Sequence, residues 1–358
     1  MSQLRTVQVL GGGSAGSSAH AGSLAAGLVA RGVRVTVCAP AALDRTHDFS
    51  ATGADFAPVP RRSDPAAVAA LRAACAQADV VHAHGLHAAV RAALAIGGRP
   101  VPLVVTWHTR AHAEGARRRL LHLLERRAVR AAAVVLATSS DLVDRARVRG
   151  ARDARLAPVA APRPPLQAAP PADKLRAELG AVERPLIVAL GSLVPHRGYG
   201  TLLDAAALWR LLDPVPLVAV VGEGRERAAL RKRITAEGLP VELLGDRPDA
   251  AALLAAADVA VLPSRWESRS TTAQQALRSG VPLVATAVGG TPELVGDAAV
   301  LVPYGDGEAL AMEVARLLVD PAARDRLAAD GLRQAASWPT EDDTVAQVLC
   351  VYDELAVG

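Results

Sequence analysis

The segment Asp258–Pro303 constrains the fold of this chain more than any other stretch. It contains two short apolar runs, Val259–Leu262 and Val281–Thr286, separated by residues with the start and stop signals of a helix. Strands and helices that alternate at this spacing predict a doubly wound parallel α/β sheet. Ligands of such sheets bind at the carboxyl ends of the strands. Glu267 and Gln275 are expected at that edge, so we take both as candidate binding residues.

The same alternation extends along most of the 358 residues, which are enough for two domains of ordinary size. Further strands are predicted at Val7–Leu10, Val33–Cys38, Asp79–His84, Val101–Thr106, Ala132–Thr138, Leu186–Leu190, Leu217–Val221 and Val241–Gly245. Ala157–Pro171 is dense in Pro and Ala and predicts the linker between the domains. Three widely spaced cysteines without metal-like spacing are typical of buried thiols in a reduced cytosol.

A glycine-rich loop follows the first predicted strand. Gly11, Gly13 and Gly16 match the G-x-G-x-x-G pattern of dinucleotide-binding proteins. A dehydrogenase would also need an acidic residue at the end of the second strand, where Cys38-Ala39-Pro40 stands. We therefore favour a glycine-rich turn of another kind over the dehydrogenase reading.

Histidines end two of the predicted strands in the first half of the chain. His84 closes one strand, and His108 follows the next. A histidine in such a place can cap the strand, or it can take part in catalysis. For a lone histidine the capping role is the commoner one, so position alone leaves His84 and His108 as open candidates, and we expect His82 on the other face of its strand.

The order of these pieces is similar to that in retaining glycosyltransferases of family 4, which have the two-domain GT-B fold. The residues that carry this resemblance are Glu267, Ala276, Ser279-Gly280-Val281-Pro282 and Gly289-Gly290-Thr291-Pro292-Glu293, with Gly222-Glu223-Gly224, Trp107-His108 and the Gly11–Gly13 loop. The chain departs from the family pattern at three places. Ser268-Arg269-Ser270 follows Glu267 where the family usually has Gly-Phe-Gly. Ser192 stands where the family has Arg, and Gln275 replaces the second Glu, whereas Arg197 keeps the positive charge of the family's Lys.

The resemblance implies two Rossmann-like domains that face a central cleft. Residues 1–170 would bind the acceptor, residues 171–335 the nucleotide-sugar donor, and residues 336–358 would form a helix that crosses back to the first domain. The reaction implied is metal-independent transfer of a hexose with retention, without any cofactor. No Asp-x-Asp motif suggests a metal.

The resemblance also assigns roles to residues. Glu267 would accept hydrogen bonds from sugar hydroxyls, Gln275 would contact the ribose, and His84 and His108 would face the acceptor. The diphosphate would be held by Arg197 and the loop with Gly12 and Gly13, and by Ser192. Catalysis is expected from His108, Glu267 and Arg197.

Charge is distributed unevenly along the chain. Residues 1–170 hold 22 arginines, no lysine and 10 acidic residues, a formal charge of +12, whereas the remainder carries −8. An anionic membrane surface or a phosphorylated acceptor fits the basic half, and no nucleic-acid motif is found. Residues 114–130 read as an amphipathic helix whose basic face is either solvated or in contact with anionic lipid. No segment reads as a membrane span, and two lysines against 38 arginines suggest a GC-rich coding sequence. A cytoplasmic bacterial protein is therefore expected, with peripheral membrane contact as an alternative.

Two function classes remain open. The first is an active glycosyltransferase with a reshaped donor site, in which Arg269 replaces the cation missing at Ser192. In that case Arg269→Ala should reduce activity about as much as Arg197→Ala. The second is a degenerate relative that acts as a binding or partner protein without turnover. Ser192, Gln275 and Ser268-Arg269 favour it, whereas Arg197, Glu267 and His108 oppose it.

Overall fold

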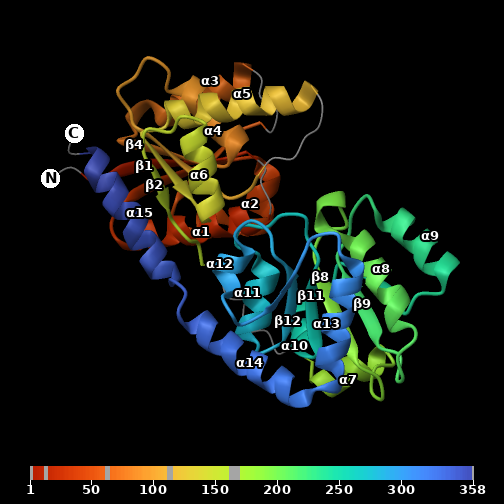
Figure 1. Ribbon diagram of the computed structural model, residues 1–358. Coiled ribbons are helices and arrows are strands. Elements are labelled where there is room, and N and C mark those ends of the chain that lie inside the picture. Colours follow the sequence, from red (N-terminus) through yellow and green to blue (C-terminus); the bar gives the residue numbers. More distant parts are fainter. Residues whose placement is uncertain (1–2, 12–14, 61–64, 111–115, 161–169, 357–358) are drawn as a thin grey trace. The chain divides into compact units, whose positions relative to one another are not determined.

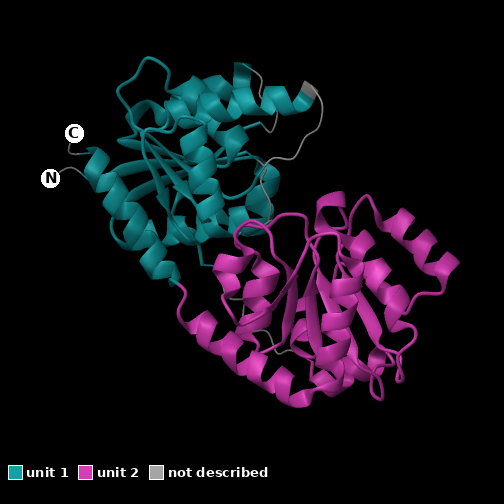
Figure 2. Cartoon of the chain, viewed as in Figure 1, with its two compact units in different colours: residues 1–162, 339–358 teal, residues 163–338 magenta. Residues whose placement is uncertain are grey.

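The computed structural model describes residues 3–11, 15–60, 65–110, 116–160 and 170–356 (Figure 1). The chain divides into two compact units. Unit 1 comprises residues 1–162 and 339–358, and unit 2 comprises residues 163–338 (Figure 2). None of the described helices is both long and apolar enough to cross a membrane.

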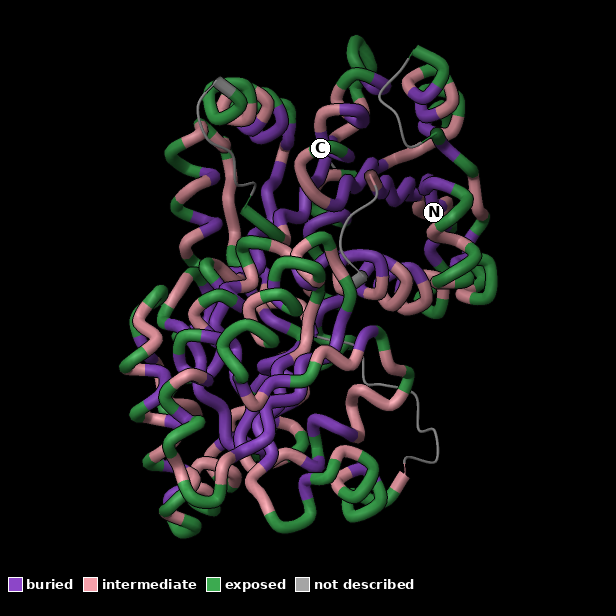
Figure 3. The backbone as a smooth tube through the Cα atoms, turned by 90° about the vertical axis from the view of Figure 1, so that its right-hand side faces the viewer, coloured by how far each residue is buried: buried purple, intermediate pink, exposed green. Residues whose placement is uncertain are grey.

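Unit 1 is built on a seven-stranded parallel sheet with the order β3-β2-β1-β4-β5-β6-β7. Its strands are β1 (Arg5–Leu10), β2 (Arg34–Ala39), β3 (Asp55–Pro58), β4 (Val80–His84), β5 (Leu103–Trp107), β6 (Val134–Ala137) and β7 (Ala154–Leu156). The central strands β4, β5 and β6 are mostly apolar because helices cover both faces of the sheet. Figure 3 colours the buried parts of the chain purple. The chain reverses its winding direction between β1 and β4, which places the switch point of the sheet there.

Helices on both faces of this sheet bury two separate cores. The helices of unit 1 are α1 (Ala15–Ala30), α2 (Ala41–His47), α3 (Pro65–Ala74), α4 (Leu86–Ala95), α5 (Ala116–Ala131), α6 (Ser140–Val148) and α15 (Glu341–Ala356), with short 3₁₀ turns at Phe49–Thr52 and Cys75–Gln77. Helices α1 and α15 pack on one face, and α3, α4 and α5 pack on the other. The last helix of the chain therefore belongs to the core of the unit that contains the first strand.

Unit 2 repeats this plan with a six-stranded parallel sheet of order β10-β9-β8-β11-β12-β13. Its strands are β8 (Leu186–Leu190), β9 (Leu217–Val221), β10 (Val241–Gly245), β11 (Val259–Leu262), β12 (Leu283–Thr286) and β13 (Val300–Val302). The two doubly wound parallel sheets predicted from the alternation of strands and helices are confirmed. Here the winding reverses between β8 and β11, so the loops that follow these two strands lie beside each other.

The helices of unit 2 also form two layers. They are α7 (Ala172–Glu178), α8 (Tyr199–Trp209), α9 (Arg227–Glu237), α10 (Ala250–Ala255), α11 (Thr271–Arg278), α12 (Thr291–Val295), α13 (Gly307–Val319) and α14 (Pro321–Ala336), with a 3₁₀ turn at Pro195–Arg197. One face of the sheet carries α8, α9 and α13, and the other carries α7, α10, α11 and α12. The helix predicted at the centre of the segment Asp258–Pro303 is α11, and Ser270 caps it by accepting from the backbone N–H of Ala273.

Candidate functional site

The loops after β8 and β11 bring two predicted site residues of unit 2 together. Arg197 ends the 3₁₀ turn that follows β8, and Glu267 lies in the loop after β11. The Arg197 guanidinium donates to Glu267 Oε1, and the Ser264 hydroxyl donates to the same oxygen at 2.7 Å. A cation and a carboxylate are thus held at the switch point of the sheet, the edge at which ligands of such sheets bind.

The ion pair between Arg197 and Glu267 is largely shielded from water. Burial raises the pKa of the Glu267 carboxyl, and Arg197 and Ser264 oppose this shift because they stabilise the charged form. Arg197 Nε is buried and makes no hydrogen bond to any residue that the structure describes. One terminal nitrogen of the guanidinium holds Glu267, and the described residues provide no acceptor for Nε.

Two glycines let the surrounding loops approach each other closely. Gly198 and Gly289 both have positive φ, at 71° and 53°. A Cβ atom on Gly198 would overlap the carbonyl of Pro263, and one on Gly289 would overlap the carbonyl of Glu267. The backbone N–H of Gly290 donates to that same carbonyl at 2.8 Å. The Gly289-Gly290 pair that the sequence singled out therefore supports the backbone that carries Glu267.

The other predicted donor residues take different positions in unit 2. Ser192 is exposed directly after β8, and Gln275 is half-buried on α11. The Arg269 guanidinium lies 5.9 Å from the centroid of the Trp338 ring, and burial lowers its pKa to about 10. Arg269 thus contacts a tryptophan that the sequence had not connected with it, and its predicted role as a replacement cation stays a prediction.

In unit 1 the predicted glycines Gly12 and Gly13 lie outside the described residues. Next to them the structure shows a residue that sequence reasoning missed. Arg91 on α4 is 1% exposed and donates to the carbonyls of Leu10, at 3.0 Å, and Pro60, at 2.9 Å. It thereby fixes the chain where β1 enters the glycine-rich loop. The sequence does contain a sign of this buried arginine, because Arg91 is the single charged residue in the otherwise apolar and alanine-rich run 88–95.

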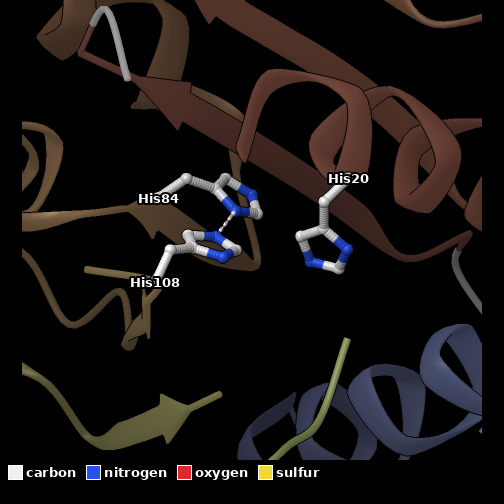
Figure 4. Close-up of side chains that lie close together, drawn as sticks. All are labelled: His20, His84 and His108. Carbon is white, nitrogen blue, oxygen red and sulfur yellow. Dashed lines mark hydrogen bonds between the residues drawn. The ribbon is translucent and has the colours of Figure 1, made fainter. Parts of the chain in front are cut away.

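Three histidines of unit 1 converge at the carboxyl edge of the first sheet (Figure 4). His20 comes from α1, His84 from the end of β4, and His108 follows β5. His84 Nδ1 and His108 Nε2 are 3.4 Å apart, and the His20 ring centroid lies 5.2 Å from that of His108. The two predicted histidines are therefore neighbours, and His20 was missed because nothing in its local sequence distinguishes it from the rest of an apolar helix.

The expectation for His82 was wrong. Its ring stacks on that of His84 with centroids 4.5 Å apart, so both lie on the same face of β4. The reason is the two-residue period of a strand, which places residues i and i+2 on one side. His82 Nδ1 lies 2.7 Å from the hydroxyl of Tyr352, and His82 Nε2 lies 2.6 Å from that of Thr106.

A buried hydrogen-bond network fixes the orientation of these rings. Gln8 on β1 donates to the Tyr352 hydroxyl at 2.8 Å, and its Oε1 lies 2.9 Å from His84 Nε2. His84 Nε2 must therefore carry the proton, since an amide oxygen only accepts. The ring then offers Nδ1 as an unprotonated nitrogen toward His108. Burial lowers the pKa of His20 to about 4 and holds those of His84 and His108 well below the usual range, so all three imidazoles are neutral.

Comparison with known proteins relates this architecture to a family. Residues 172–334 match the family model described as glycosyl transferases group 1, and residues 15–162 match the glycosyl transferase 4-like domain. The D-inositol 3-phosphate glycosyltransferase of Jonesia denitrificans is 31% identical over 310 residues, which cover 78% of this chain and 72% of that protein. The chain belongs to the group 1 glycosyltransferases. The resemblance drawn from the motifs is thereby confirmed.

One further relative and two solved structures are also similar to this chain. The MMP α-(1→4)-mannosyltransferase of Mycolicibacterium hassiacum is 34% identical over 188 residues, 49% of this chain and 44% of that protein. The structure of HepE from Anabaena in complex with UDP-glucose superposes with a TM-score of 0.83 at 21% identity, over 99% of this chain and all of that one. The structure of the glycosyltransferase WaaG gives 0.71 at 18% identity, over 99% and 100%. These neighbours confirm the predicted GT-B fold class.

Proposed function

We propose that this glycosyltransferase moves a hexose from a nucleotide-sugar donor to an anionic acceptor, with retention and without a metal at the donor. The observation that carries the proposal is the pair formed by Arg197 and Glu267 at the switch point of the second sheet. Two comparisons support it. One relative is a D-inositol 3-phosphate glycosyltransferase, and the structural neighbour HepE was solved with UDP-glucose.

The donor would lie over the carboxyl edge of the sheet in unit 2. Arg197 would hold the diphosphate through the donors that do not bind Glu267, while the Glu267 carboxylate would accept hydrogen bonds from sugar hydroxyls. Gln275 would contact the ribose, because an amide can both donate to one hydroxyl and accept from another. Ser192 and the loop with Gly12 and Gly13 would add neutral donors to the diphosphate.

Transfer needs a stabilised leaving group more than it needs a nucleophile from the protein. A positive charge held in place at the diphosphate stabilises the negative charge that develops as the sugar leaves, and one such contact is worth about 3–4 kcal/mol. The leaving phosphate would take the proton of the acceptor hydroxyl on the same face of the sugar, which yields retention. The neutral imidazole of His108 would orient that hydroxyl, with His84 held beside it at 3.4 Å.

The acceptor is proposed to be anionic because unit 1 presents mostly positive charge. Its helix α5 also exposes a face suited to anionic lipid. Leu120 and Leu123 are 57% and 62% exposed on it, and they are surrounded by the exposed arginines Arg119, Arg126, Arg127 and Arg130. Apolar side chains within a basic helical face are typical of peripheral membrane binding. The acceptor would then be met at the inner face of a bacterial membrane.

A binding screen tests the donor site first. UDP, GDP and ADP, each with its common sugar conjugates, are added to the purified chain and followed by thermal shift and calorimetry. We expect one nucleotide sugar to bind, and its affinity to fall by at least about a hundredfold in Arg197→Ala and in Glu267→Ala. Hydrolysis of that donor then measures turnover, and Arg269→Ala should reduce it as much as Arg197→Ala does. If Arg269→Ala leaves turnover intact, Arg269 does not replace the missing cation.

The second candidate is a relative that binds without turnover. It is favoured by Ser192, Gln275 and Ser268-Arg269, which stand where the family usually has other residues. Donor binding with no hydrolysis or transfer would support it. The absence of binding by every nucleotide at millimolar concentration would refute the donor site itself.

A further inference from the structure

The proposed transfer gives roles to His84 and His108, and it does not account for the third histidine, His20, that lies beside them. The three histidines come from three separate elements, and one nitrogen of each lies within 4.8 Å of one nitrogen of each of the others. Three imidazoles without a carboxylate among them form a donor set that suits Zn²⁺ and its neighbours in the first transition row, and not Mg²⁺ or Ca²⁺. We propose that this cluster is a binding site for a divalent transition metal, with Zn²⁺ as the natural occupant.

The distances fit this ion. Zn–N bonds of about 2.0–2.1 Å in a tetrahedron place two ligand nitrogens about 3.3–3.4 Å apart. His84 Nδ1 and His108 Nε2 are separated by 3.4 Å. The third ligand, His20, has to approach by roughly 1.4 Å at most to close the triangle from the 4.8 Å limit. Figure 4 shows the His20 ring beside the pair formed by His84 and His108.

The surroundings of His84 match those of a metal-binding histidine. Such histidines usually donate their second ring N–H to an oxygen that fixes the tautomer. His84 does so to Gln8 Oε1, and Gln8 is held in turn by Tyr352 and Thr6. Without the metal, His108 Nε2 donates its proton to His84 Nδ1. Metal binding would move that proton to Nδ1 of His108 and free both nitrogens for the ion, with no change of oxidation state.

The site would leave one coordination position open. Three neutral imidazoles leave the charge of the ion uncompensated in buried surroundings, which favours an anionic oxygen as the fourth ligand. His20 also lines a narrow hollow together with Ser23, Glu341 and Thr344. The class of additional ligand we infer is hydroxide, phosphate or carboxylate. This proposal stands on the geometry of unit 1 and does not rest on the proposed transfer.

The test uses the full-length chain without a histidine tag, stripped with a chelator. Zn²⁺ is titrated by calorimetry, and Co²⁺ is titrated while the visible spectrum is recorded. We expect one ion per chain and the intense visible band of four-coordinate Co²⁺, which inorganic phosphate should shift by occupying the open position. His20→Gln and His84→Gln should each weaken Zn²⁺ binding by about a hundredfold or more, since losing a direct ligand exceeds the effect of losing its partner. His122→Gln on α5 of the same unit is the matched control and should bind as the parent does.

A second variant guards against a change that only harms folding. Gln8→Leu keeps all three ligands and removes the acceptor that orients His84, and it should weaken Zn²⁺ binding about 10–100-fold. Zinc should also raise the unfolding temperature of the parent and not that of His20→Gln, because an ion that binds only the native state stabilises it. Binding that is unaffected by His20→Gln, or lost in His122→Gln, would overturn the proposal, as would the absence of a Co²⁺ band in the folded parent chain.

Discussion

At Glu267 two opposing effects set the pKa of the carboxyl. Burial raises it, whereas Arg197 and the Ser264 hydroxyl lower it by stabilising the charged form. Only an ionised Glu267 accepts hydrogen bonds on both oxygens, so donor binding should fall as the pH drops through this pKa. Ser264→Ala removes a hydrogen bond to a charged group, worth about 1.5–3 kcal/mol, and should move the acid limit of binding up by about one to two pH units. Calorimetry between pH 5 and 8 checks this with the donor found in the screen, and Ser279→Ala is the control. An unmoved acid limit would show that Glu267 does not control it.

At the scale of one element, helix α5 combines two unlike faces. Its inner side buries Glu125, which pairs with Arg145 at 2.7 Å and with Arg149 at 2.8 Å, and its outer side exposes Leu120 and Leu123. The double variant Leu120→Ser/Leu123→Ser should reduce co-sedimentation with phosphatidylglycerol vesicles by about tenfold or more, because each leucine contributes roughly 1 kcal/mol or more when it enters lipid. Met312→Ser, at a residue 66% exposed in unit 2, is the control. Binding to the parent should also weaken at high salt. Equal sedimentation of parent and double variant would refute a lipid contact through α5.

At the scale of the whole molecule, the last helix completes the core of the first unit. The Tyr352 hydroxyl on α15 bonds both Gln8 of β1 and His82 of β4, although it lies more than 260 residues away from each in the sequence. Tyr352→Phe leaves both partners short of a hydrogen bond in a buried place and should lower the stability of unit 1 by about 1–3 kcal/mol. Hydrogen exchange should then accelerate in β1 and β4 and stay unchanged in the sheet of unit 2. Tyr304→Phe, at a residue 44% exposed in unit 2, is the control. Uniform acceleration in both units would contradict this assignment of α15.

The sequence by itself determined the two doubly wound sheets, the strands that end in site residues, and Glu267 as a candidate, and the family resemblance added Arg197. The sheets, the strand ends and Glu267 follow from local patterns, because apolar runs, helix caps and glycine pairs act over a few residues of chain. Only the tertiary structure decided which side chains meet. Four sets of contacts join residues that are remote in sequence. They are the ion pair of Arg197 with Glu267, the cluster of His20 with His84 and His108, the hydrogen bond from Arg91 to the carbonyl of Leu10, and the hydrogen bonds of Tyr352. Such contacts depend on strand order and helix packing, which bring together positions whose spacing along the chain carries no regular pattern.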